Sequence, residues 1–236
     1  MRLTDGDTPE VRVVFVPSLQ VTILDTWEVS GLAGTGSHDF VIDQVFVAEE
    51  YTWRVGLGMR PRAKPYQGPL YRFPFMGSFA LPVSAVALGI AQGAVEACME
   101  LAHAKRPAGG MQLLCDRPLF QVQIAEAVAL VRSARAWLHT SLQQAWEATV
   151  RRGEVSFQER ADLLLAAANA TRCAATAVDI AYTAAGGTAN YRRSSLQRSL
   201  RDIHAVTQHT VTVPQQYEVA GRMLLGLPPS QPFILL

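Results

Sequence analysis

Three long segments with a helical pattern and clear start and stop signals constrain the fold of this chain most. Residues 77–105 are rich in Ala, Val and Leu, and they end at the Pro-Ala-Gly-Gly of 107–110. Residues 118–151 begin with a proline suited to a first helical turn and end before Arg-Gly. A third segment opens with a Ser-x-x-Glu capping box at 156–159 and runs to about Ala185, before Gly-Gly. Long helices joined by short loops predict an up-down bundle.

The residues before this bundle have a different pattern. β-Branched residues cluster at 11–16, 21–24 and 40–47, with prolines and glycines between the clusters. These runs predict three or four short strands of an antiparallel sheet. The prolines and glycines of residues 54–75 predict an irregular connection to the first long helix.

Two shorter helices are expected after the long ones, over about 194–208 and from Pro214 to about residue 225. The predicted fold is therefore mainly α with a small β part. We expect a partial antiparallel β domain over residues 1–75 and a helical bundle domain over 76–236.

Composition narrows the classes of partner. The net charge is +1 and only 17% of the residues are charged, so neither a nucleic acid nor an anionic membrane is expected as partner. Low charge with many alanines favours coverage of part of the surface by other subunits. Polar residues interrupt the apolar stretch 79–97, which predicts a buried core helix and no membrane span. The N-terminus has no targeting pattern, so a soluble, cytoplasmic protein is expected.

The usual catalytic and metal-binding motifs are absent. The sequence contains no G-x-G-x-x-G, no P-loop, no H-E-x-x-H and no G-x-S-x-G. The three cysteines, Cys98, Cys115 and Cys173, are far apart and have no metal-ligand spacing. We therefore expect reduced, mostly buried thiols and no metal site.

Two segments carry residues suited to binding. Residues 27–39 form a glycine- and hydroxyl-rich loop between predicted strands. Glycines let backbone N–H groups approach an anion or a flat ring, and Thr35 or Ser37 can hydrogen-bond the polar edge of such a ring. An ordinary hairpin connection explains the loop equally well.

The second segment begins with Gly186 and Gly187 and continues into a predicted helix that carries Arg201, His204 and His209. The two histidines point to different faces of a helix, so at most one is expected to face a given cleft. Structural capping explains this polar patch about as well as catalysis.

Taken together, the two segments resemble the acyl-CoA dehydrogenase superfamily. The middle β domain of that superfamily carries the pattern W-x-x-x-G-x-x-x-T-x-S before a strand that ends in V-F-V-P. Trp27, Gly31, Thr35 and Ser37 match the first part, and residues 45–48 match the second with alanine in place of proline.

The C-terminal four-helix domain of the superfamily carries a Gly-Gly turn and then an Arg-Asp pair. Gly186, Gly187, Arg201 and Asp202 match these positions, so the resemblance covers nearly the whole chain. It implies an acyl-CoA dehydrogenase-like up-down four-helix bundle and a flavin cofactor, either FAD or FMN. The cofactor-binding residues that it implies are Trp27, Thr35, Ser37, Gly186, Gly187 and Arg201.

The segment after the Arg-Asp pair separates two branches of the superfamily. True acyl-CoA dehydrogenases commonly place a catalytic glutamate there, in a Tyr-Glu-Gly context. Residues 207–211 contain no carboxylate and contain His209 instead. A histidine at this place resembles the two-component flavin-dependent monooxygenases, which include aromatic hydroxylases, and the tail 217–226 is similar to that branch.

The resemblance implies that a separate flavin reductase delivers reduced flavin, which reacts with O2 to hydroxylate an aromatic or related small molecule. An imidazole near the flavin serves as a general base toward a phenol-like substrate. His209 is predicted to be that catalytic group, with His204 as the second candidate. Superfamily members assemble as homo-dimers or homo-tetramers through the bundle.

Two alternatives stay open. An acyl-CoA dehydrogenase-like enzyme that oxidises an acyl thioester needs a buried carboxylate over the flavin, for which Glu96 and Glu126 are candidates. Superfamily members also carry an N-terminal helical domain and first β strands, which this chain is expected to lack. A non-catalytic subunit, or a half enzyme completed by an N-terminal partner chain, is the second alternative.

Overall fold

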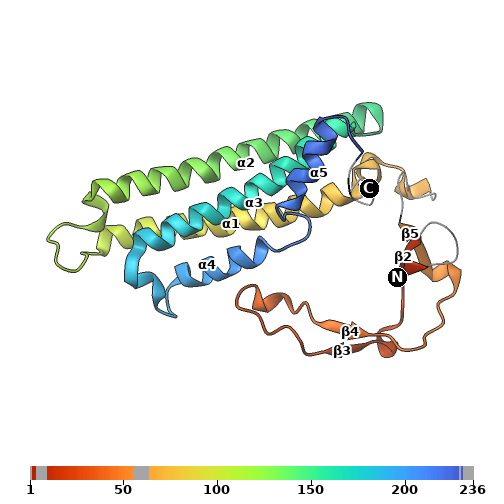
Figure 1. Ribbon diagram of the computed structural model, residues 1–236, viewed down its shortest axis with the longest axis horizontal. Helices are drawn as coiled ribbons and strands as arrows, with labels where there is room; N and C mark the ends of the chain where they lie inside the picture. The colour runs from red at the N-terminus through yellow and green to blue at the C-terminus, as the bar shows by residue number, and fades with distance from the viewer. Residues whose placement is uncertain (1, 4–9, 56–63, 229, 231–236) are drawn as a thin grey trace.

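The computed structural model describes residues 2–3, 10–55, 64–228 and 230, and every structural statement below concerns these residues. Its body is a bundle of long helices: α1 (Phe75–Ala104), α2 (Pro118–Arg152) and α3 (Phe157–Ala185). The shorter α4 (Ser195–Val206) and α5 (Gln215–Leu224) follow (Figure 1). The helix α3 is central because it packs against the four others. The predicted fold, mainly α with a small β part, is confirmed.

Local sequence signals explain the helix boundaries. Pro118 occupies the first turn of α2, where its missing N–H costs nothing. Gly153 ends α2 with a φ of 77°, a backbone conformation that glycine adopts easily. The Ser156 side chain accepts from the Glu159 N–H, and the Glu159 carboxylate accepts from the Ser156 N–H, so the predicted capping box is present.

Alanine makes up most of the buried surface of α3. Small side chains let neighbouring helices lie close together, so polar side chains of α1 can donate hydrogen bonds to backbone carbonyls of α3. The Ser84 hydroxyl donates to the carbonyls of Ala80 (2.7 Å) and Ala167 (3.0 Å). The Cys98 thiol donates to the Ala181 carbonyl on α3 (3.3 Å).

The strands form two small antiparallel sheets. In the first the order is β1 (Arg2–Leu3), β2 (Glu10–Val14) and β5 (Thr52–Val55), and the second pairs β3 (Thr22–Leu24) with β4 (Asp39–Val41). The prediction of a single sheet was therefore wrong.

The predicted strand 40–47 was also too long. β4 ends at Val41, and Gln44 has a φ of 48°, which interrupts the extended backbone. Residues 52–55 form a strand, whereas residues 54 and 55 belong to the predicted irregular connection.

Short 3-10 turns connect these elements. They are η1 (Ser18–Gln20), η2 (Ala33–Thr35), η3 (Glu49–Tyr51), η4 (Lys64–Tyr66), η5 (Pro69–Arg72), η6 (Leu114–Asp116) and η7 (Gly186–Asn190).

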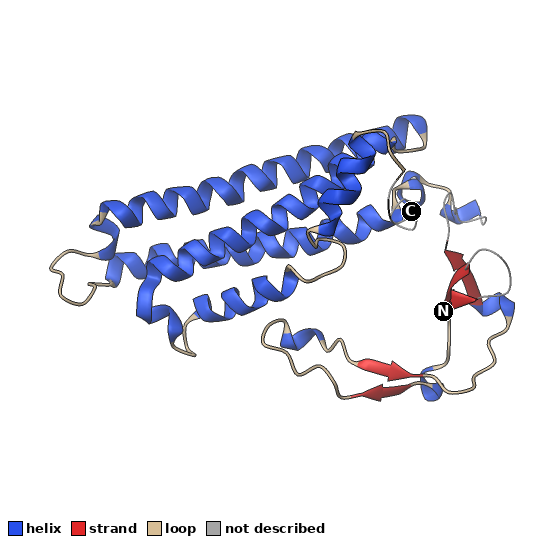
Figure 2. Ribbon diagram, viewed as in Figure 1, coloured by secondary structure: helices blue, strands red, loops and turns tan. Residues whose placement is uncertain are grey.

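The hairpin formed by β3 and β4 reaches from the rest of the β part toward α4, and we call it the hairpin arm (residues 22–41) (Figure 1). All side chains of β3 and β4 are exposed. The loop between the two strands, here called the glycine loop (residues 27–38), is the tip of this arm and lies next to α4 (Figure 2). It is this loop that brings the β part to the bundle.

Two helical segments, Gly77–Ala104 and Phe157–Asn190, are long and apolar enough to cross a membrane by length and composition alone. Core helices of soluble proteins meet the same criterion, so this is weak evidence for a membrane span. In the most apolar window of the second segment, 61% of the residues are buried within the bundle. The helices α1 and α3 pack against each other as core helices do.

The three cysteines are free thiols, as predicted. Cys98 is buried, whereas Cys115 and Cys173 are half-buried. Burial raises the pKa of Cys98 to about 11, although the nearby charge of Lys105 opposes the shift. This thiol is therefore neutral at physiological pH.

Candidate functional site

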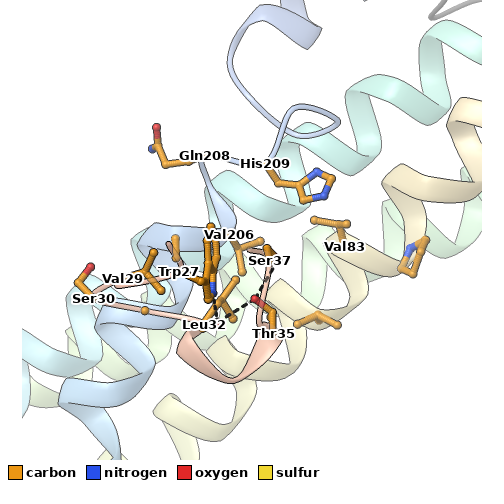
Figure 3. A pocket seen from close by; sticks show the side chains of 14 residues that line it. Trp27, Val29, Ser30, Leu32, Thr35, Ser37, Val83, Val206, Gln208 and His209 are labelled. Atoms are coloured by element: carbon orange, nitrogen blue, oxygen red, sulfur yellow. Dashed lines mark hydrogen bonds between the residues drawn. The ribbon is translucent and has the colours of Figure 1, made fainter. Parts of the chain in front are cut away.

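A pocket of about 680 Å³ lies between the glycine loop, α1 and the end of α4 (Figure 3). This volume is in the range of small-molecule sites, roughly 300–1,000 Å³. Its walls bring together three segments that are far apart in the sequence. The lining residues are Trp27, Val29, Ser30, Gly31, Leu32, Thr35, Ser37, Pro82, Val83, Val86, Ala205, Val206, Gln208 and His209.

The glycine loop is folded around the carbonyl of Leu32. This carbonyl accepts hydrogen bonds from the Trp27 indole (3.2 Å) and the Thr35 hydroxyl (2.9 Å), and Leu32 itself has a φ of 54°. The Thr35 and Ser37 hydroxyls are 3.2 Å apart (Figure 3). Thus Trp27, Thr35 and Ser37, three predicted cofactor-binding residues, come together on one wall of the pocket.

His38 holds the base of the glycine loop. Its Nδ1 accepts from the backbone N–H groups of Thr26 and Trp27, each at 3.2 Å. The Asp39 N–H donates to the Thr26 hydroxyl at 2.9 Å. These bonds fix the strand ends from which the loop departs.

The loop is docked on α4 by the Arg-Asp pair. The Leu32 N–H donates to the Asp202 carboxylate (2.8 Å), and the Arg201 guanidinium donates to the Ser30 carbonyl (2.5 Å). Gly31 is buried between them, and a Cβ at this position would lie 2.1 Å from the Arg201 carbonyl oxygen. The backbones of loop and helix therefore touch, which only glycine permits at this place.

His209 lies in the turn that follows α4 and lines the pocket together with Val83 of α1 (Figure 3). Its Nδ1 accepts from the Val211 N–H at 3.4 Å. A neutral imidazole that accepts at Nδ1 carries its proton on Nε2. The helix α4 ends at Val206, earlier than predicted, so His209 is on a turn and does not follow the helical spacing.

The other predicted residues lie elsewhere. His204 faces α3, where its Nε2 is 2.8 Å from the Asp179 carboxylate, and it does not line the pocket. Gly186 and Gly187 belong to η7 at the end of α3, outside this pocket. Arg201 contacts the loop backbone and the Gln197 side chain (3.1 Å).

Sequence reasoning missed the helical wall of the pocket. Pro82, Val83 and Val86 of α1 line it, although the apolar stretch 79–97 had been interpreted as core. The exposure of Val86, at 53%, shows that one face of this helix is not covered by the bundle. An apolar side chain in an apolar helix carries no signal that separates a core position from a pocket wall.

The chemistry of the lining is largely apolar. Among the described residues that line the pocket there is no Asp, Glu, Lys or Arg, and His209 is the titratable group. No cluster of metal-binding side chains occurs in the described part of the chain. The pocket suits a flat, uncharged ring with hydrogen-bonding groups at its edge.

Comparison with known proteins identifies the bundle. Residues 81–214, more than half of the chain, match the family model described as the C-terminal domain of acyl-CoA dehydrogenase. The chain is 36% identical over 227 residues to an indole-3-acetate monooxygenase of Pseudomonas putida, covering 95% of this chain and 57% of that protein. It is 30% identical over 235 residues to the oxygenase subunit HsaA of a flavin-dependent monooxygenase from Rhodococcus jostii, covering 96% of this chain and 60% of the relative.

A solved structure shows the same arrangement. The crystal structure of 3-HSA hydroxylase from Rhodococcus sp. RHA1 superposes with a TM-score of 0.87 at 27% identity, over 98% of this chain and 60% of the other. The chain thus spans somewhat more than half the length of these proteins. On the evidence of the bundle, the ordered motifs and the family match, the chain belongs to the acyl-CoA dehydrogenase superfamily and carries its C-terminal domain.

Proposed function

We propose that this chain provides the helical part of the oxygenase component of a two-component flavin-dependent monooxygenase, which hydroxylates an aromatic or related small molecule. The observation that carries the proposal is the pocket, in which Trp27 and two hydroxyl groups face a histidine and no carboxylate lines the described walls. The names of the relatives, an indole-3-acetate monooxygenase and a flavin-dependent monooxygenase subunit, support it.

The described lining fits a flavin ring. Trp27, Leu32 and Val86 offer an apolar surface to a flat ring, and Thr35 and Ser37 offer hydroxyls to the polar edge. Bound reduced flavin, as FAD or FMN, would supply the electrons for activation of O2. Gly186 and Gly187 lie outside this pocket, so contacts from them require a ligand that extends beyond it or a neighbouring subunit.

His209 is the proposed catalytic residue. With its Nδ1 turned to the Val211 N–H, its Nε2 can exchange a proton with a hydroxyl or N–H group of an aromatic substrate. His204 is the weaker candidate because its ring faces Asp179. The largely apolar lining would favour the exclusion of water once a ligand or a further segment covers the open side of the pocket.

An acyl-CoA dehydrogenase reaction has less support. Glu96 is exposed and accepts a hydrogen bond from Gln92 (2.6 Å), and Glu126 is exposed on α2. Neither lines the pocket, so neither is placed to remove a proton from a substrate held there.

The partners follow from the same proposal. A flavin reductase would supply reduced flavin, as the name oxygenase subunit of the Rhodococcus relative suggests. The proposed location of this system is the cytoplasm. The exposed strands β3 and β4 need further strands or a cover to be stable, which favours completion by an N-terminal partner segment. A homo-dimer or homo-tetramer formed through the bundle would cover its exposed apolar side chains.

The catalytic proposal is tested by measuring how much hydroxylated product forms for each NADH that is consumed. The chain, together with an N-terminal segment from a relative if needed, is supplied with a flavin reductase, NADH, FAD and a panel of phenols and indoles. We expect His209→Ala to form at least tenfold less product per NADH consumed. A general base contributes at least on the order of 10²-fold, and water that replaces the imidazole in the variant recovers part of this contribution. His103→Ala, which replaces an exposed histidine outside the pocket, is the matched control. Unchanged coupling in His209→Ala would refute the role of His209.

A further inference from the structure

We propose that Asp202 and Arg201 are positioning residues that dock the glycine loop on α4 and thereby hold one wall of the pocket in place. The proposal goes beyond the proposed function, because it assigns a positioning role to Asp202 and to Arg201, of which Arg201 is predicted from the resemblance to bind the cofactor. Loop docking and ligand binding are then coupled.

The first observation is the pair of hydrogen bonds across the docking surface. Asp202 accepts from the Leu32 N–H and Arg201 donates to the Ser30 carbonyl, across 170 and 171 positions of sequence. A charged side chain thus meets a backbone group in each bond, which makes these bonds stronger than neutral ones. Both side chains are occupied with the loop, and neither lines the pocket.

The second observation is the close contact between the bonds. Gly31 is buried, and its Cα faces the Arg201 carbonyl so closely that a Cβ would also lie 2.9 Å from the Asp202 nitrogen. The surface of the loop is therefore shaped for this part of α4. By contrast, the side chains of β3 and β4 are all exposed, so the strands of the hairpin arm add little to docking.

The third observation links the docking surface to the pocket wall. The Leu32 N–H is held by Asp202, and the carbonyl of the same residue holds the Trp27 indole and the Thr35 hydroxyl. Displacement of Leu32 from α4 therefore displaces the ring and the hydroxyl that face the pocket. A ligand that touches both walls binds only the docked state, so its apparent affinity falls in proportion to the docked fraction.

The test places a reporter on Trp27. The full chain, with its four tryptophans labelled as 5-fluorotryptophan, is studied by ¹⁹F NMR, and Trp27→Phe assigns the resonance. We expect Asp202→Ala to shift or broaden the Trp27 signal and leave Trp137 and Trp146 unchanged. Asp202→Asn keeps an oxygen acceptor for the Leu32 N–H and should restore the native signal. Arg198→Ala, an exposed arginine on the same helix, is the control.

Each outcome decides the proposal. A native Trp27 signal in Asp202→Ala overturns it, and so does an Asp202→Asn signal that is as disturbed as that of Asp202→Ala. If all four signals collapse in Asp202→Ala, the pair supports the whole bundle and the local role is wrong.

A titration with FMN adds a second readout, for which we expect at least a tenfold loss of affinity in Asp202→Ala and a clearly smaller loss in Asp202→Asn. Wild-type affinity in Asp202→Ala would overturn the coupling. If the wild-type chain binds no FMN, the proposed function fails, whereas the fluorine signals still decide the docking.

Discussion

Replacing Gly31 by alanine is expected to undock the glycine loop from α4. The new Cβ would lie 2.1 Å from the Arg201 carbonyl oxygen, whereas ordinary contact begins at 3.4 Å. The obstructing atoms belong to a helix backbone and cannot rotate away. The loop must therefore retreat by more than 1 Å.

A retreat of this size breaks the docking bonds. The 2.8 Å bond from Leu32 to Asp202 would stretch beyond the usual limit for a hydrogen bond, roughly 3.2 Å. A hydrogen bond to a charged group contributes about 1.5–3 kcal/mol, and we take the lower part of that range because the loop is partly exposed and the released groups regain water. We therefore expect loop docking to weaken by about 1.5–2 kcal/mol.

Amide hydrogen exchange at Leu32 measures this change. A loss of about 1.4 kcal/mol corresponds to roughly tenfold faster exchange, because exchange follows the free energy of local opening. Gly34→Ala is the matched control, since a Cβ at Gly34 meets nothing within 4 Å. Unchanged protection of Leu32 in Gly31→Ala, or an equal loss in Gly34→Ala, would show that the close contact at Gly31 does not hold the loop on α4.

Two further predictions concern the start of α3. Ser156→Ala removes the side-chain cap and should destabilise the protein by about 1 kcal/mol, which corresponds to a Tm lower by roughly 2–4 °C, whereas Ser133→Ala on the exposed surface of α2 should change Tm little. Burial alone would raise the pKa of Glu159, but hydrogen bonds from Arg152 and Ser156 outweigh burial and lower it. The stabilisation from this carboxylate is therefore present above the ordinary carboxyl pKa of about 4.3 and is lost as the pH falls through the lowered folded value. Urea unfolding at a series of acid pH values should show a shallower loss of stability in Glu159→Gln than in the wild type, and identical slopes would contradict the assignment.

The helices could be predicted from sequence because their signals are local. Each signal acts within one turn of the helix end that it marks. The signals are Pro118 at the start of α2, Gly153 at its end and the capping box of Ser156 at the start of α3. The strand predicted over 40–47 failed because nothing in the sequence around Gln44 indicates a left-handed backbone. Two separate sheets likewise arise from pairing between distant segments.

The site could be predicted only in part. Trp27, Thr35, Ser37 and His209 do line one pocket, but their meeting depends on contacts between residues 30–32 and α4 that no local pattern encodes. His204 lies on the face of α4 that meets α3. The sequence alone does not tell which face of α4 packs on α3 and which face borders the pocket.

The central claim is that this pocket belongs to an oxygenase that uses reduced flavin. Its most direct test is the origin of oxygen in the product, when the chain, completed by a relative's N-terminal segment if needed, turns over a phenol or indole with a flavin reductase under ¹⁸O2. We expect a product that carries one oxygen atom from ¹⁸O2. An oxidised product without labelled oxygen, as a dehydrogenase would form, would contradict it.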